Sequence, residues 1–184
     1  MKTFKSILVA ISVTVLLSAV PVFGQVRGNS VISNPQLAKQ VRHELVTLPY
    51  YGVFDNLAYN INGGTVTLYG QVVRPTTKSS AENRVKQLRG VSRVVNNIEV
   101  LPLSSFDDNI RVATLRSIAR TAGLSRYLRG ANPSLHIVVD RGHVTLEGVV
   151  SNSSDRNLAN IAARSVPGAF SVTNNLRVEG ENIG

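Results

Sequence analysis

The chain contains no cysteine, and this absence excludes several classes of structure and chemistry. Without cysteine, no disulfide stabilises the fold, no lipid is attached through a thiol, and no thiol nucleophile is available. The three histidines, His43, His136 and His143, are dispersed along the sequence. They therefore offer neither a catalytic arrangement nor the convergent ligands that a metal site needs. The sequence predicts a protein that is not an enzyme and that uses no cofactor.

Acidic residues are also scarce, because 11 Asp and Glu face 20 Lys and Arg. A strongly basic protein would ordinarily suggest a nucleic-acid partner. The first 24 residues argue against this interpretation, since they have the features of a signal peptide: Lys2 and Lys5, an apolar stretch over residues 7–17, and small residues before Gln25. Outside the cytoplasm, anionic lipid headgroups and acidic glycans are the abundant polyanions. The alternative is that the positive charge only keeps the protein soluble.

We therefore expect residues 1–24 to be removed by cleavage near Gln25 and residues 25–33 to form a linker. The alternative is an uncleaved membrane anchor. It is disfavoured because the apolar stretch over residues 7–23 contains Pro21 and is shorter than the roughly 20 residues of a membrane-spanning helix. Without Lys2 and Lys5 the chain keeps 18 basic and 11 acidic residues, a net charge of +7.

The most informative feature of the sequence is an internal repeat. Residues 57–100 and residues 135–178 align without a gap at an offset of 78 residues, with 13 identities in 44 positions. Two copies are too few for a solenoid, which needs about three or more repeats to bury a shared core. The repeat therefore predicts two compact domains, at residues 34–101 and 107–179.

Each copy predicts the element order helix, strand, strand, helix, strand. Asn34-Pro35 and Asp107-Asp108 are typical of helix starts. The apolar stripes expected to face the core are Leu37, Val41, Leu45 and Leu48 in the first helix, and Val112, Leu115, Ala119 and Ala122 in its counterpart.

A hairpin with a two-residue turn should follow in each copy, with apolar residues opposite one another. The expected pairs are Tyr59/Leu68, Ile61/Val66, Ile137/Leu146 and Val139/Val144. Helices over residues 76–89 and 154–166 then lead to third strands, over residues 91–100 and 169–178, that run parallel to the second strands. The predicted class is α+β: two tandem helix-strand-strand-helix-strand modules, each a three-stranded mixed sheet packed against two helices.

The sequence segments at these positions resemble a known family. GGTVTLYGQV at residues 63–72 and RGHVTLEGVV at residues 141–150, followed by GVSRVVNNIEV and GAFSVTNNLRV, are similar to the two halves of a tandem BON-domain protein. The resemblance implies a periplasmic protein that associates with phospholipid membranes or envelope partners. The asparagine pairs, Asn96-Asn97 and Asn174-Asn175, are expected to bond nearby backbone at a strand end rather than a ligand.

The candidate functional region is the acid-free stretch of residues 111–129, which holds five arginines. Arginine next to tyrosine favours an anionic membrane surface, where each basic group contributes about 1 kcal/mol. The predicted lipid-binding residues are Arg116, Arg120, Arg126, Tyr127, Leu128 and Arg129. The alternative is an ordinary solvated helix face, with Tyr127 and Leu128 tucked into the core.

The first module has an aromatic but uncharged counterpart at residues 48–54. Three interpretations stay open for it: it covers the end of its own sheet, it docks against the other module, or it binds another protein. The sequence as a whole predicts an exported protein that binds anionic phospholipid through its second module. The alternative function is a periplasmic protein-interaction adaptor or a stress-protective scaffold.

Overall fold

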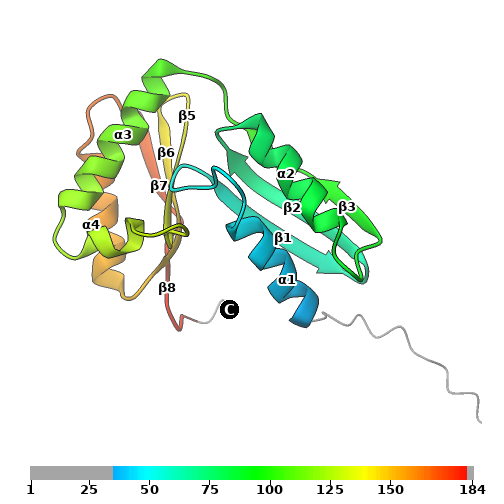
Figure 1. The fold of residues 1–184 in the computed structure, drawn as a ribbon. Coiled ribbons are helices and arrows are strands. Elements are labelled where there is room, and N and C mark those ends of the chain that lie inside the picture. Colours follow the sequence, from blue (N-terminus) through cyan, green and yellow to red (C-terminus); the bar gives the residue numbers. More distant parts are fainter. Residues whose placement is uncertain (1–34, 182–184) are drawn as a thin grey trace, which may run out of the picture. The chain divides into compact units, whose positions relative to one another are not determined.

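The computed structural model describes residues 35–181. The predicted signal peptide, the linker and the Asn34 cap lie outside these residues. Figure 1 shows two modules that repeat the same order of helices and strands. The predicted α+β class of two tandem modules is confirmed.

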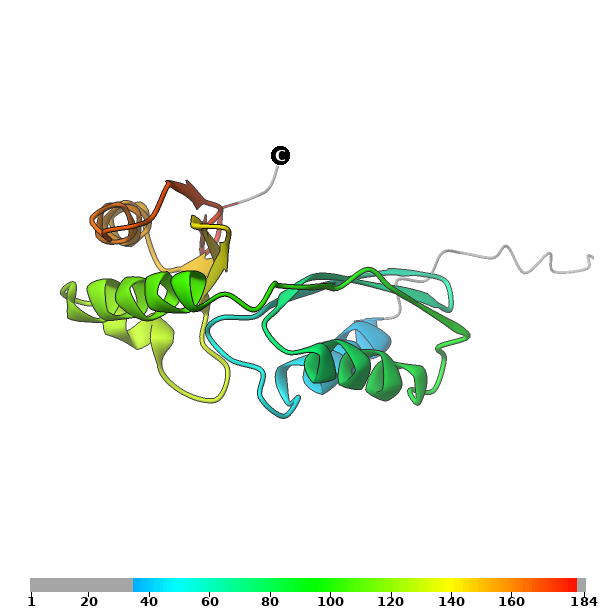
Figure 2. The ribbon, with the colours of Figure 1, turned by 90° about the horizontal axis from the view of Figure 1, so that it is seen from above.

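The first module begins with helix α1 (Pro35–Val46), which packs against α2 (Pro75–Lys86). Its sheet contains β1 (Asn56–Asn62), β2 (Thr65–Val72), β3 (Arg93–Asn96) and β4 (Glu99–Val100). The predicted stripe of α1 is confirmed, because Leu37, Val41, Leu45 and Leu48 are all buried. Both helices lie on one face of the sheet (Figure 2).

The second module repeats this plan with one addition. Helix α3 (Ser105–Arg120) is followed by a short 3-10 helix, η1 (Leu124–Leu128), and then by β5 (Leu135–Asp140) and β6 (His143–Val150). Helix α4 (Ser153–Arg164) leads to β7 (Ser171–Asn174) and β8 (Arg177–Val178).

The predicted strand register is confirmed in both copies. Tyr59 lies opposite Leu68, and Ile137 lies opposite Leu146. In each sheet the second strand pairs antiparallel with the first and parallel with the third, as the crossover through a helix requires.

The third strand of each module is interrupted at the asparagine pair. The side chain of Asn96 accepts a hydrogen bond from Ile98 N and donates one to the carbonyl oxygen of Lys78 on α2. Asn174 repeats both bonds with Leu176 N and the carbonyl oxygen of Arg156. The asparagines therefore tie the broken strand to the preceding helix, which confirms their predicted structural role.

The predicted core stripe of α3 is wrong. Val112 is 37% exposed, Leu115 is half-buried and Ala119 and Ala122 are exposed, whereas Ile110, Thr114 and Ile118 are buried. The reason is that two polar residues, Asp107 and Arg111, occupy the buried side of the helix. Hydropathy cannot identify a stripe in which charged side chains replace apolar ones.

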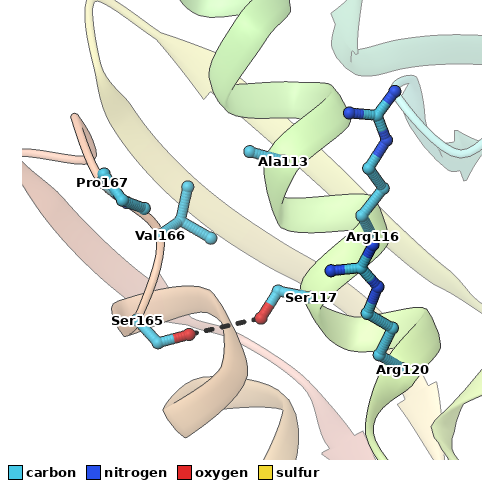
Figure 3. Close-up of a pocket in the computed structure, with 7 residues that line it drawn as sticks. All are labelled: Ala113, Arg116, Ser117, Arg120, Ser165, Val166 and Pro167. Carbon is cyan, nitrogen blue, oxygen red and sulfur yellow. Dashed lines mark hydrogen bonds between the residues drawn. The ribbon is translucent and has the colours of Figure 1, made fainter.

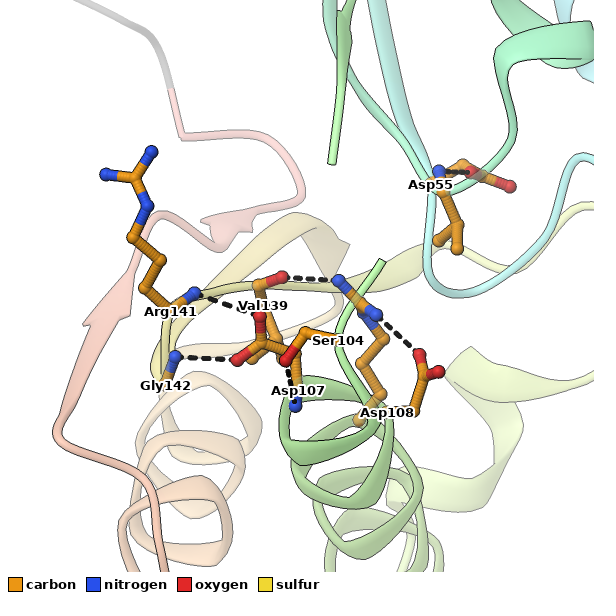
Figure 4. Close-up of polar contacts among 9 residues, drawn as sticks. Asp55, Ser104, Asp107, Asp108, Val139, Arg141 and Gly142 are labelled. Carbon is orange, nitrogen blue, oxygen red and sulfur yellow. Dashed lines mark hydrogen bonds and ion pairs between the residues drawn. The ribbon is translucent and has the colours of Figure 1, made fainter. Parts of the chain in front are cut away.

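These two side chains hold the β5–β6 hairpin against α3 (Figure 4). The carboxylate of Asp107 accepts hydrogen bonds from Arg141 N and Gly142 N at 3.1 and 2.7 Å. The Arg111 guanidinium donates to the carbonyl oxygen of Val139 and to Asp108, each at 2.6 Å. Asp107 thereby satisfies backbone groups of the hairpin turn, and Arg111 satisfies a backbone carbonyl of β5.

Each module has its own buried cluster of apolar side chains. Both clusters lie within one compact unit of the described chain. The aromatic segment of residues 48–54 contributes to both, because Leu48 and Tyr51 pack into the first cluster and Val53 and Phe54 pack against the second. Of the three interpretations of this segment, the structure supports packing on its own module together with docking against the other.

Candidate functional site

Arg116 and Arg120 are the members of the predicted lipid-binding set that are free to meet a ligand. Both are exposed on α3, and neither forms an ion pair with any residue of the described chain. They line a shallow groove between α3 and the end of α4, together with Ala113, Ser117, Ser165, Val166 and Pro167 (Figure 3). The hydroxyl of Ser117 already has a partner within the protein, because it donates a hydrogen bond to the carbonyl oxygen of Ala162 at 2.7 Å.

Tyr127 does not lie at a surface. It is 6% exposed, and its hydroxyl donates to the carboxylate of Asp155 at 2.6 Å while accepting from Ser151 N at 3.0 Å. Arg126 donates to the same carboxylate at 2.5 Å and stacks over the Tyr127 ring, with its Cζ 4.7 Å from the ring centroid. Its hydrogen bond to Tyr127 and the nearby Asp155 raise the pKa of Arg126. Tyr127 and Arg126 therefore attach η1 to the start of α4.

The remaining members of the set are divided between surface and core. Leu128 packs, partly buried, against the second cluster. Arg129, the residue after η1, is exposed, and its guanidinium donates a 3.3 Å hydrogen bond to the hydroxyl of Ser125 in η1. Of the six residues predicted to bind lipid, Arg116, Arg120 and Arg129 are therefore the ones that are exposed and form no ion pair among the described residues.

A second exposed feature of this module was not predicted. Phe106 and Phe170 are 45% and 70% exposed, and their ring centroids lie 5.7 Å apart. The His143 ring meets Phe170 edge-on at 6.0 Å. The two phenylalanines cover Gly142, where a Cβ would come within 2.7 Å of the Phe170 ring. This aromatic pair is therefore a packed surface feature rather than two isolated side chains.

The connection from α4 to β7 links the aromatic pair to the arginine groove. Val166 and Pro167 line the groove that holds Arg116 and Arg120. Phe170, four residues after Val166, lines a second hollow with the exposed Arg164. Arg164 forms no ion pair within the described residues. The α4–β7 connection thus runs from exposed aromatic rings near the start of α3 to Arg116 and Arg120 near its end, and among the described residues neither these two cations nor Arg164 forms an ion pair.

The sequence contained a signal for the aromatic pair that periodicity does not use. At the 78-residue offset Phe170 corresponds to Ser92, which lies against Gly64 in the first module as Phe170 lies against Gly142 in the second. The exchange of serine for phenylalanine at an exposed position adds apolar surface that folding does not require. Comparing the two repeats for the positions at which they differ would have identified the aromatic pair.

Within residues 35–181, no three His, Asp or Glu side chains converge as a metal site would require. His136 lies opposite Glu147 and His143 opposite Asp140. The same part of the chain contains no helix with the length and apolar character of a membrane span.

Comparison with known proteins identifies the fold. The model of the BON domain matches residues 33–102 and again residues 107–180. The chain belongs to the BON-domain family. BON domains are linked to membrane or phospholipid binding in envelope proteins, and BON-domain proteins are generally non-enzymatic binding proteins. The predicted tandem BON organisation is therefore confirmed.

No curated protein matches the sequence. Two solved structures of CdsD, a structural protein of the type III secretion system of Chlamydia trachomatis, are similar to it at 14% and 13% identity. The similarity to the first, a C-terminal domain, covers 80% of this chain and 99% of that one, with a TM-score of 0.32. The second covers 79% and 94%, with a TM-score of 0.29. Similarity at this level carries no functional argument.

Proposed function

We propose that this tandem BON-domain protein is exported and binds anionic phospholipid membranes through its second module. The observation that carries the proposal is the combination of exposed aromatic rings near the start of α3 with arginines near its end and at the end of α4 that form no ion pair among the described residues. Arg116, Arg120 and Arg164 supply positive charge, and Phe106 and Phe170 supply apolar surface. An interface of lipid headgroups rewards both, because basic groups are attracted to anionic lipids and aromatic rings partition into the interface.

The local charge supports lipid as the partner. Three acidic residues lie close to the aromatic pair in the described chain, and each of the three has a partner within the protein. Asp107 is buried and bonded to the hairpin backbone, Asp108 is paired with Arg111, and Asp140 lies 3.8 Å from Arg141. In this region the exposed charged side chains without an ion pair among the described residues, Arg116, Arg120 and Arg164, are therefore positive.

Export is supported by the sequence of residues 1–24, which combines lysines, an apolar stretch and small residues before Gln25. A signal peptide followed by two BON domains also resembles OsmY, a tandem BON-domain protein of the periplasm. We expect mass spectrometry of the mature polypeptide to place its first residue near Gln25. Detection of Lys2 or Lys5 in the mature protein would favour a membrane anchor instead.

Vesicle sedimentation tests the lipid proposal. Binding to vesicles of phosphatidylglycerol and phosphatidylcholine should exceed binding to phosphatidylcholine alone and should weaken with salt. The double variant Arg116→Glu/Arg120→Glu should bind at least about tenfold more weakly, because each basic group near an anionic surface contributes about 1 kcal/mol. Phe170→Ser, which introduces the residue of the first module, should weaken binding while keeping the charge.

The matched control is Lys86→Glu/Arg89→Glu, which makes the same change of charge on exposed residues of the first module. Equal weakening by both double variants would mean that binding is a diffuse effect of net charge. If the unmodified protein does not bind anionic vesicles at low salt, the lipid proposal is wrong.

The alternative function, a protein-interaction adaptor or stress-protective scaffold, has one observation in its favour. Leu158 and Ile161 are exposed and lie one turn apart on α4, which gives the second module an apolar ridge. An adaptor should form a defined complex that survives moderate salt, whereas lipid binding through arginines should not.

A further inference from the structure

Strand β5 is buried on both faces, unlike its counterpart in the first module. His136 and Val138, on the face turned away from the second core, are 7% and 5% exposed. The corresponding residues of β1, Ala58 and Asn60, are exposed. The outer face of β5 must therefore be covered by a part of the chain that has no equivalent on β1.

The cover is the segment of residues 51–55, which precedes β1. The amide of Ile137 donates a 2.7 Å hydrogen bond to the carbonyl oxygen of Val53, so the segment pairs with the edge of β5. Val53 and Phe54 pack against the apolar cluster of the second module. The contact connects the two BON domains through both main-chain pairing and apolar packing.

His136 lies within this contact. Its Nδ1 is 3.3 Å from the carbonyl oxygen of Gly52, and its Nε2 is 3.4 Å from the hydroxyl of Tyr51. The two rings are tilted, with centroids 5.5 Å apart. A neutral imidazole with the proton on Nδ1 satisfies both partners, because Nδ1 then donates to the carbonyl and Nε2 accepts from the hydroxyl.

Few charged groups are placed to stabilise a positive charge on His136. Asp55 is the one acid of residues 51–55, and its carboxylate already accepts hydrogen bonds from Gly52 N and Val73 N. Glu147 lies opposite His136 on β6 and accepts from Asn175.

Charged side chains on two other elements of the second module, α3 and η1, are bonded to partners of their own. On α3, Arg111 is bonded to Val139 and Asp108, and on η1, Arg126 is bonded to Asp155. Arg74 and Arg42 act on Asp55 and Tyr51 respectively, at longer range.

Burial dominates the electrostatics of the contact. It lowers the pKa of His136, against the opposing effects of the Gly52 carbonyl and of Asp55. Burial also raises the pKa of Asp55 from its usual value and, together with the negative charge of Asp55, raises the pKa of Tyr51 to about 12. All three shifts disfavour the charged form of a group held between the modules.

We propose that the contact between residues 51–55 and β5 is a pH-sensitive latch, which loosens when His136 is protonated and then exposes the outer face and edge of β5. The direction of the pH effect follows from the thermodynamic linkage between docking and proton binding by His136. The docked state binds fewer protons than the undocked state, in which His136 titrates near its ordinary value of about 6.5. Docking therefore has its full strength above that pH and weakens as the pH falls below it.

The amide of Ile137 reports docking directly, because its hydrogen bond crosses the contact. The amide of Val149, which donates to the carbonyl oxygen of Ser134 within the second module, is an internal control. Hydrogen exchange followed by NMR on the full chain gives a protection factor for each of the two amides. Because a protection factor is measured relative to the exchange rate of an unprotected amide at the same pH, it is corrected for the intrinsic effect of pH on exchange. Between pH 7.5 and 5.5 we expect the protection of Ile137 to fall about tenfold, the change that one linked proton allows per pH unit. Val149 should be unchanged.

Two histidine variants separate the latch from general acid effects. His136→Asn keeps a side-chain amide near the position of Nδ1 and should abolish the pH dependence at Ile137. His143→Asn, at an exposed histidine of the same hairpin, should leave it intact. In a direct titration, the ring resonances of His136 should give a pKa below that of a free histidine.

Three results would each overturn the latch. These are an Ile137 amide whose protection does not change with pH, a His136→Asn variant that keeps the full pH dependence, and a His136 pKa at or above the ordinary value. An equal loss of protection at Ile137 and Val149 would mean that the second module itself unfolds, and this result would also reject the latch.

Discussion

Replacing Tyr127 with phenylalanine tests whether this residue serves the fold or the membrane. The change removes one hydroxyl and leaves the buried ring in place. In the structure this hydroxyl donates to Asp155 at 2.6 Å, accepts from Ser151 N at 3.0 Å, and accepts from Arg126 at 2.8 Å. Asp155 itself is buried and is also the acceptor for Asn152, so the hydroxyl belongs to a network around a buried carboxylate.

The expected loss follows from these partners. A hydrogen bond to a charged group contributes about 1.5–3 kcal/mol to stability. Asp155 keeps its bonds to Arg126 and Asn152, and the amide of Ser151 is on an exposed residue that water can reach. Both facts place the cost toward the lower part of that range. We expect Tyr127→Phe to lower the free energy of unfolding by about 2 kcal/mol.

Urea denaturation at pH 7 measures this loss. We expect the urea concentration at the midpoint of unfolding to fall, while the dependence of the unfolding free energy on urea concentration stays unchanged. Tyr50→Phe is the control, because Tyr50 is 70% exposed and its ring, which stacks with Arg74, is retained. Vesicle binding of the folded Tyr127→Phe protein should equal that of the unmodified chain. A variant of normal stability with weakened vesicle binding would show that Tyr127 acts at the membrane, and the structural reasoning would fail.

Two further predictions concern the backbone and alkaline pH. Gly148→Ala should destabilise the protein by about 3 kcal/mol or more in urea denaturation, because its φ is +119° and an added Cβ would lie 2.0 Å from the carbonyl oxygen of Ser134. Gly130→Ala, with φ +90° but open space around it, should cost only about 1 kcal/mol, and equal losses would contradict the steric argument. Because the pKa of Tyr51 is raised from 10.0 to about 12, its contribution to stability is complete below pH 10 and is lost as the pH rises toward 12. Tyr51→Phe should therefore reduce the slope of stability against pH in this window, by at most about 1.4 kcal/mol per pH unit. An unchanged slope would show that Tyr51 is not held as the structure has it.

The strands of both modules were predictable because their signal is local. Apolar residues alternate along each hairpin, and a short turn fixes which residues face each other, so Ile61 and Val66 could be paired from spacing alone. The repeat strengthened this inference, since two independent copies gave the same register. The α1 stripe was predictable for a related reason, because four apolar residues one turn apart leave a single choice of buried face.

The candidate site was less predictable because its side chains depend on partners that are distant in sequence. Arg126 and Tyr127 looked like surface residues beside other arginines, but Asp155, 28 residues after Tyr127, binds both. Arg111 looked equally free, but the carbonyl oxygen of Val139 holds it in the core. Charge counting within one stretch of sequence cannot distinguish a solvated arginine from one that a distant acceptor holds.

The differences between the copies carry information that their identities do not. The shared glycines, valines and asparagines maintain the same hairpin and the same interrupted strand in each module. Ser92 against Phe170, and Ala58 against His136, are exchanges that this common fold does not require. Phe170 adds apolar surface that faces outward, and His136 adds a titratable group at the one strand face that the other module covers. The two copies therefore differ at two surfaces of the second module, one exposed to solvent and one against the first module. Duplication of the fold allows a binding surface and an inter-domain contact to be altered separately while the core stays the same.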